Sequence, residues 1–154
     1  MRCPHCSAAM DPSPQALGPL SAEHGALRLT LEHLPACICP KGHHAPVDAD
    51  FMLWLIQELK ERAAKLPAAE EKGLLVKKYL CGCGRELGAK PDHRETVHEA
   101  VSYEGGPAFG AVFDFAMHRC AGCGTAQLRS RRQALADVSH ALAGITDAAR
   151  FPHG

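Results

Sequence analysis

Hydrophobic residues alternate with polar ones along several stretches of this chain. Between Ala26 and Leu34, leucines occupy every second position and polar side chains lie between them, which is the period of a half-buried strand. Residues 96–103 and 109–118 also have the pattern of β-strands. The turn sequence Glu-Gly-Gly-Pro lies between them, so the two stretches predict a hairpin. Residues 74–80 predict a further strand, which leads directly into a cysteine. One face of the 109–118 strand is expected to carry Phe109, Ala111, Phe113 and Phe115.

Two other stretches predict helices. The first begins after Asp48 or Asp50 and runs to about Leu66, where Pro67 ends it. The second begins near Ser130 and carries one apolar stripe, formed by Leu135, Val138, Leu142 and Ile145.

The first helix contains six consecutive apolar residues, 51–56, which point in every direction around the helix axis. It must therefore be buried between the two halves of the chain, against a second copy, or in a partner protein. Burial between the halves is the favoured interpretation. If the helix instead binds a partner, Phe51 and Trp54 are its expected contacts.

Composition narrows the function classes. The chain has 154 residues, with 17 basic and 17 acidic side chains, and this balance argues against a strongly basic nucleic-acid binder. No apolar run approaches the length of a membrane span, and the N-terminus does not resemble a secretory signal. We therefore expect a cytoplasmic protein with no membrane partner.

Eight cysteines form four close pairs in the sequence. In a reducing compartment such pairs indicate metal ligands rather than disulfides. Two pairs have the spacing C-x-x-C and two have C-x-C, and they are Cys3/Cys6, Cys37/Cys39, Cys81/Cys83 and Cys120/Cys123. A tetrahedral Zn²⁺ site needs four such ligands, so each half of the chain predicts one zinc ion and the whole chain two.

The ligands of the second site follow directly from the cysteine pairs. Cys81, Cys83, Cys120 and Cys123 are the clustered candidates in this half. His118 is an alternative ligand in case one thiolate cannot reach the ion.

The first site leaves a choice. Cys3 and Cys6 form a C-P-x-C turn, and Cys39-Pro40 repeats its opening, which favours Cys39 and His43 as the other two ligands. The alternative places Cys37 in the site in place of His43. In the favoured assignment Cys37 is a small buried hydrophobic residue.

These motifs predict a small metal-stabilised α+β protein of two tandem zinc ribbons, each a short antiparallel sheet followed by a helix. The units are expected at 1–66 and 74–154, with residues 67–73 as a linker. Because each unit is too small to fold stably without its metal ion, we expect chelation of the metal to unfold both units.

About the first 65 residues resemble the YgiT/MqsA-type zinc-finger domain. The resemblance is carried by the N-terminal C-P-x-C, the Leu34-Pro35-Ala36 strand end, Cys39-Pro40 and a helix that follows an acidic cap. That domain occurs in antitoxins and in small bacterial proteins, and the antitoxin form continues into a DNA-binding helix-turn-helix. A second ribbon takes that place here, so the resemblance does not imply DNA binding. The second half resembles generic C-x-x-C-G ribbons.

We therefore expect a non-catalytic zinc protein that acts as an adaptor for a protein or, more weakly, for a nucleic acid. The arginines at the start of the last helix, Arg129, Arg131 and Arg132, are candidate contacts for phosphate or an acidic partner. One alternative is an antitoxin-like regulator that sequesters a partner protein through the first ribbon and its helix. Another is a metalloenzyme or a redox-sensing thiol protein, although no familiar catalytic motif is present.

Overall fold

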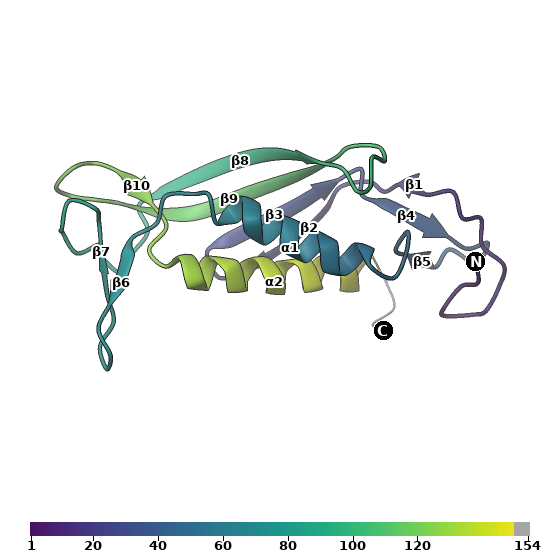
Figure 1. Cartoon of the computed structure of the whole chain (residues 1–154), viewed down its shortest axis with the longest axis horizontal. Coiled ribbons are helices and arrows are strands. Elements are labelled where there is room, and N and C mark those ends of the chain that lie inside the picture. The colour runs from purple at the N-terminus through teal and green to yellow at the C-terminus, as the bar shows by residue number, and fades with distance from the viewer. Residues whose placement is uncertain (150–154) are drawn as a thin grey trace.

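The computed structural model describes residues 1–149, which form two helices and ten strands in the order shown in Figure 1. The strands of the first half are β1 (Gln15–Ala16), β2 (Leu20–His24), β3 (Leu27–Glu32), β4 (Pro35–Ile38) and β5 (His44–Ala45). Those of the second half are β6 (Glu70–Lys72), β7 (Lys78–Leu80), β8 (His93–Val101), β9 (Phe109–Arg119) and β10 (Ala126–Gln127). The helices are α1 (Phe51–Ala63) and α2 (Arg131–Ala148).

The main sheet is antiparallel and is built around β9. Strand β8 pairs with β9 along one edge, from Val101 opposite Phe109 to His93 opposite Met117. Strand β3 pairs with the other edge of β9, and β2 continues the sheet beyond β3. Strand β10 pairs with the end of β9. Two smaller sheets, β1–β4–β5 and β6–β7, lie at opposite ends of the long axis (Figure 1).

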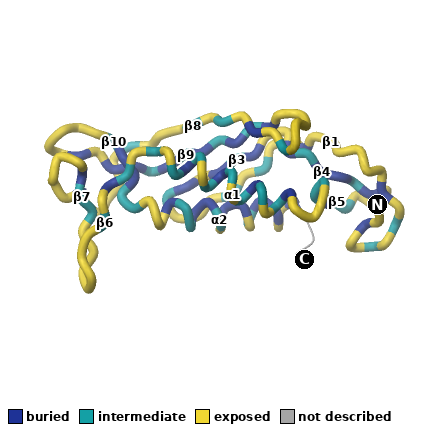
Figure 2. Tube along the Cα trace, in the orientation of Figure 1, coloured by how far each residue is buried: buried dark blue, intermediate teal, exposed yellow. Residues whose placement is uncertain are grey.

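Both helices cover the same face of the main sheet. Helix α1 buries Phe51, Leu55, Leu59 and Ala63, one residue for each turn. The predicted stripes of β9 and α2 are buried with them, apart from the partly buried Leu135, so a single core runs between the sheet and the helices (Figure 2). The opposite face of the sheet carries polar pairs such as Arg94–Asp114.

The predicted helix starts are confirmed. Ser130 is the N-cap of α2, and its hydroxyl accepts a hydrogen bond from the Gln133 amide at 3.2 Å. At α1 the cap comes from Asp48, whose Oδ1 accepts from the Phe51 amide at 2.9 Å, while the Asp50 side chain makes no capping bond.

The sequence predicted a separate ribbon sheet in each half, whereas the structure has one main sheet to which both halves contribute. Strand β3 from the first half pairs with β9 from the second, and helices from both halves share one core. Apolar β3 side chains gain more burial on β9 than a small separate sheet could offer. The expected linker 67–73 contains β6, and only the end of the predicted 74–80 strand is a strand, β7.

No helix among residues 1–149 is long and apolar enough to cross a bilayer.

Candidate metal centres

Four turns of closely similar backbone geometry carry the predicted ligands. In each turn the first cysteine receives a backbone hydrogen bond at its carbonyl and donates its amide to a residue four or five positions later, with all these distances between 2.8 and 2.9 Å. Each turn also contains one residue with a positive φ angle, and these residues are Ser7, Gly42, Gly84 and Gly124. The C-x-x-C turns at Cys3 and Cys120 are one residue longer than the turns at Cys39 and Cys81. Each site thus combines one long and one short turn.

The first site lies at the end of the molecule formed by the N-terminus and β4–β5 (Figure 1). It brings together the ligand atoms of Cys3, Cys6, Cys39 and His43, all within 4.8 Å of one another. The His43 Nδ1 atom lies 3.4 Å from the Cys39 sulfur and 3.6 Å from the Cys3 sulfur. The sulfurs of Cys6 and Cys39 are 3.9 Å apart.

Cys37 lies outside this group. Its side chain is fully buried, and its sulfur lies 3.6 Å from the Pro12 carbonyl oxygen. Burial raises the pKa of the Cys37 thiol, which favours the protonated form over the thiolate that binds metal. The structure therefore places His43, and not Cys37, with the other three candidates.

The second site lies at the opposite end of the molecule, beside β7 and β10 (Figure 1). The sulfurs of Cys81 and Cys123 are 3.5 Å apart, as are those of Cys83 and Cys120. All four lie within 4.8 Å of one another. His118 is not in this group: its Nε2 lies 3.4 Å from the Ala89 carbonyl oxygen.

Backbone amides favour the thiolate form in both sites. Burial raises the pKa of Cys39, but the amides of His43 and Lys41, together with the thiols of Cys3 and Cys6, outweigh it, so the pKa is lowered overall. The amides of Cys123 and Gly122 likewise lower the pKa of Cys120.

Two other sulfurs of the second site, those of Cys123 and Cys83, have pKa values shifted in opposite directions. Hydrogen bonds with the hydroxyl and backbone of Thr125 lower the pKa of Cys123 to about 6. The backbone of Arg85 lowers the pKa of Cys83, yet the thiol of Cys120, burial and the other sulfurs raise it to about 11. Four adjacent sulfurs cannot all ionise without a cation among them, so metal binding here releases protons.

The distances fit a tetrahedral zinc site. With Zn–S near 2.3 Å and Zn–N near 2.0 Å, the edges of the tetrahedron are about 3.8 Å between sulfurs and about 3.5 Å between sulfur and nitrogen. The shortest contacts between ligand atoms in the two sites, 3.4 to 3.9 Å, lie close to these values, and all ligand atoms of each site lie within 4.8 Å of one another. Each set also supplies four protein ligands, which leaves no open coordination position.

Sequence reasoning missed a buried amide beside the second site. Gln127 is only 3% exposed, and its Nε2 donates to the Cys81 sulfur at 3.1 Å. Such partners orient metal ligands and tune their affinity. Its position four residues after Cys123 was the only sequence signal, and this spacing alone does not indicate burial beside a sulfur.

The two α1 residues that were expected to contact a partner, Phe51 and Trp54, pack against other residues of this chain. Phe51 is fully buried, so the prediction that it contacts a partner does not fit the structure. Trp54 is half-buried, and its ring lies 4.9 Å from the ring of Tyr103. Among the apolar residues 51–56, only Leu53 is exposed, at 66%.

The three arginines at the start of α2 point to different partners. The Arg129 guanidinium lies over the Tyr79 ring at 4.3 Å. Arg131 donates to the Leu66 carbonyl oxygen at 3.0 Å, and Arg132 to the Glu71 carboxylate at 3.3 Å. Each of the three arginines thus has a partner within the chain.

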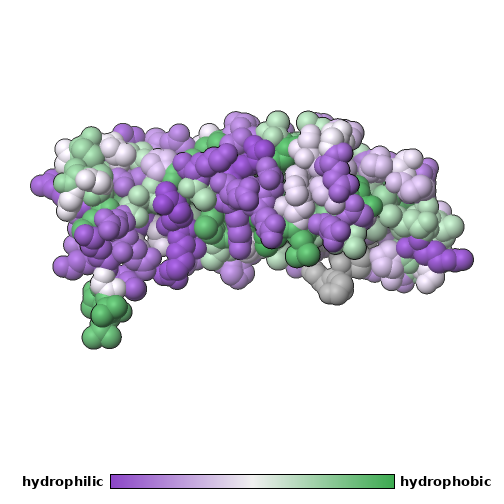
Figure 3. All heavy atoms as spheres, viewed as in Figure 1, coloured by the Kyte–Doolittle hydropathy of each residue, from purple (hydrophilic) through white to green (hydrophobic). Residues whose placement is uncertain are grey.

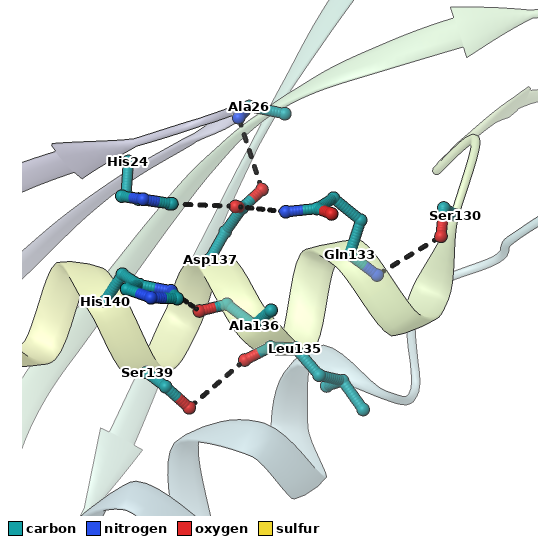
Figure 4. Close-up of polar contacts among 9 residues, drawn as sticks. All are labelled: His24, Ala26, Ser130, Gln133, Leu135, Ala136, Asp137, Ser139 and His140. Atoms are coloured by element: carbon teal, nitrogen blue, oxygen red, sulfur yellow. Dashed lines mark hydrogen bonds and ion pairs between the residues drawn. The ribbon is translucent and has the colours of Figure 1, made fainter.

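A second polar group missed by sequence reasoning joins α2 to the β2–β3 turn (Figure 4). Asp137 is 1% exposed, and its carboxylate lies 3.0 Å from His24 Nδ1, 3.3 Å from the Ala26 amide and 3.0 Å from Gln133 Nε2. Gly25 has φ +57°, and a Cβ there would lie 2.5 Å from Asp137 Oδ1. The carboxylate thus holds a strand turn on the helix.

Comparison with protein-family models, with curated proteins and with solved structures gives no match for this chain.

Proposed function

We propose that this protein is a non-catalytic zinc protein that binds two Zn²⁺ ions and serves as an adaptor for another macromolecule. The observation that carries the proposal is the pair of four-ligand groups, one Cys₃His and one Cys₄, at opposite ends of one α+β core. Both are ligand sets of structural zinc sites. The bound metal would hold the paired turns of each end together.

The closed ligand sets favour a structural role over a catalytic one. Catalytic zinc sites keep one position for water or substrate, whereas each group here can fill the tetrahedron. The amides that donate to Cys39 and Cys120 support thiolates whose charge a divalent ion balances.

Metal analysis of the purified protein tests this proposal. We expect two zinc ions per chain, and one after Cys81→Ala and Cys120→Ala are combined. Gln57→Ala, which changes an exposed residue of α1, is the matched control and should keep two. A metal-free protein, or a different metal in both sites, would overturn the zinc assignment.

The resemblance of the first 65 residues to the YgiT/MqsA-type domain supports a bacterial protein that binds a partner protein through its first metal centre. The side chains of Cys3, Cys6, Cys39 and His43 lie close together, which is compatible with that resemblance. Sequestration through α1 has less support, because most of its apolar side chains pack within the chain. Exposed residues near the metal centres are better candidates for contacts.

A further inference from the structure

The β6–β7 hairpin carries the most exposed apolar residues of the described chain. Its tip contains Leu74, Leu75 and Val76, which are 95%, 100% and 74% exposed. Figure 3 shows this tip as an isolated hydrophobic projection below the body of the molecule. Single exposed apolar residues are common, but three adjacent ones at the end of a protruding hairpin indicate an interaction site.

The tip has a defined shape. Gly73 has φ +105°, and any Cβ at this position would overlap the Val76 carbonyl oxygen, so the turn requires glycine. The strands on either side are paired, with Lys72 opposite Lys78 and Glu71 opposite Tyr79.

Positive charge surrounds the apolar tip. Lys72, Lys77 and Lys78 flank it on both strands, and all three are exposed. Like charges directly opposite each other weaken a strand pair, so Lys72 and Lys78 do not serve hairpin stability. Lys72 and Lys77 each lie 3.8 Å from a glutamate nearer the base, and such exposed ion pairs are weak enough to be exchanged.

The base of the hairpin is fixed on the second metal centre. Ala69 packs with Cys81, Cys120 and Leu87, and its amide donates to the Leu128 carbonyl oxygen at 2.8 Å. Strand β7 ends immediately before Cys81. The hairpin is thus a short arm with a rigid base.

From this arrangement we propose that the hairpin tip inserts into the surface of a membrane that contains anionic lipids. Along the arm, apolar side chains come first, lysines second and glutamates last, which is the order that hydrocarbon, anionic headgroups and water require. The lysine stems can pass along the apolar region while their ammonium groups reach lipid phosphates. A convex tip needs no preformed pocket in a fluid bilayer. The sequence-based expectation of no membrane partner considered only spanning segments.

Vesicle co-sedimentation of the full-length protein tests this proposal. The probes are vesicles of phosphatidylcholine alone and of an equimolar mixture with phosphatidylserine. We expect binding to the anionic vesicles, reduced by about tenfold or more in Leu74→Ser/Leu75→Ser because two inserted leucines are lost. Leu53→Ser, an exposed leucine of α1, is the matched control and should bind like the natural chain. Lys72→Gln/Lys78→Gln, which leaves only Lys77 beside the tip, should bind anionic vesicles more weakly and with a smaller dependence on salt.

Three results would overturn the proposal. These are no binding to anionic vesicles, equal binding to neutral vesicles, or full binding by the double serine variant. A dimer that the serine substitutions dissociate, without vesicle binding, would show that a second copy covers the tip instead. Zinc content is measured on the same samples, so failure of lipid binding is distinguished from failure of the proposed metal centres.

Discussion

Cys37 and Cys39 are separated by one residue, yet their surroundings give them opposite chemistry. The sulfur of Cys39 accepts from two backbone amides, which lower its pKa. The sulfur of Cys37 lies in the protein interior, where burial raises its pKa. The difference comes from the turn at Pro40–His43, which folds its amides back over Cys39 only.

This contrast predicts the metal content of two variants. Cys39→Ala should retain one zinc per chain, because the first centre loses a ligand that holds both turns. Cys37→Ala should retain two and lose about 1 kcal/mol of stability, since only a small buried group is removed. Elemental analysis and urea unfolding measure these outcomes. One zinc in Cys37→Ala would show that Cys37, not His43, is a ligand.

Gln127 offers a test of a residue that supports a ligand without binding metal. Gln127→Ala removes the amide that donates to Cys81, so we expect both metals to remain but the second to bind about tenfold more weakly. Titration with a competing chelator measures this affinity. If Gln127→Ala and Gln57→Ala lost metal at the same chelator concentrations, Gln127 would have no role in metal binding at the second centre.

At the scale of elements, two carboxylates fix the helices, the exposed one of Asp48 and the buried one of Asp137. Asp48 caps α1 and also accepts from the Tyr103 hydroxyl, with both oxygens at 3.0 Å, so it joins the helix to the β8–β9 connection. Asp137 joins α2 to the β2–β3 turn. Local sequence predicted the first contact in part, since Asp48 precedes an apolar run. It could not predict Asp137, whose acceptor role depends on a turn more than a hundred residues earlier.

Asp137 of α2 and Asp114 of β9 should differ in their contribution to stability. Asp137→Ala leaves the Ala26 amide without its acceptor, and we expect a loss of about 1–3 kcal/mol in the free energy of unfolding. Asp114→Ala, which removes an exposed ion pair with Arg94, should cost less than about 1 kcal/mol. Urea unfolding at neutral pH compares them, and similar losses would contradict the role given to Asp137.

The Tyr103–Asp48 contact predicts a dependence on alkaline pH. Burial, followed by the hydrogen bond to Asp48, raises the pKa of Tyr103 to about 12 from the usual value of 10. The folded state therefore holds the phenol proton more tightly than the unfolded state, and this stabilisation is complete below pH 10 and lost as pH rises towards 12. Tyr103→Phe should be less stable than the natural chain at neutral pH. The gap in Tm between the two should narrow above pH 10; a constant gap would contradict this explanation.

At the scale of the whole molecule, the sequence predicted both helices, the longer strands β3, β8 and β9 and the grouping of the candidate ligands, but not the short strands or how the halves combine. Periodicity and C-x-x-C spacing are local signals, so they located β3, β9, the helices and the turns. The pairing of β3 with β9 joins residues about eighty positions apart and depends on which apolar faces fit best. It also explains why α1 needs no partner to cover most of its apolar residues.

The shared sheet changes what metal removal should do. Two separate ribbons would unfold with their metals, as the sequence suggested. In the structure, the two groups of candidate metal ligands lie at opposite ends, while β3, β9, α1 and α2 form a core that contains none of these ligands (Figure 2).

We therefore expect chelation to release the ends and to leave the centre folded. Hydrogen exchange after chelator treatment should rise in residues 1–10, 39–45, 81–86 and 120–127. Residues 27–31 and 111–117 should keep their protection, because their apolar side chains stay buried between sheet and helices. The free energy of unfolding should still fall, since the metals bind only the folded turns. If the core exchanged as fast as the turns, the two metals would be holding the entire fold. If the turns stayed protected, they would need no metal.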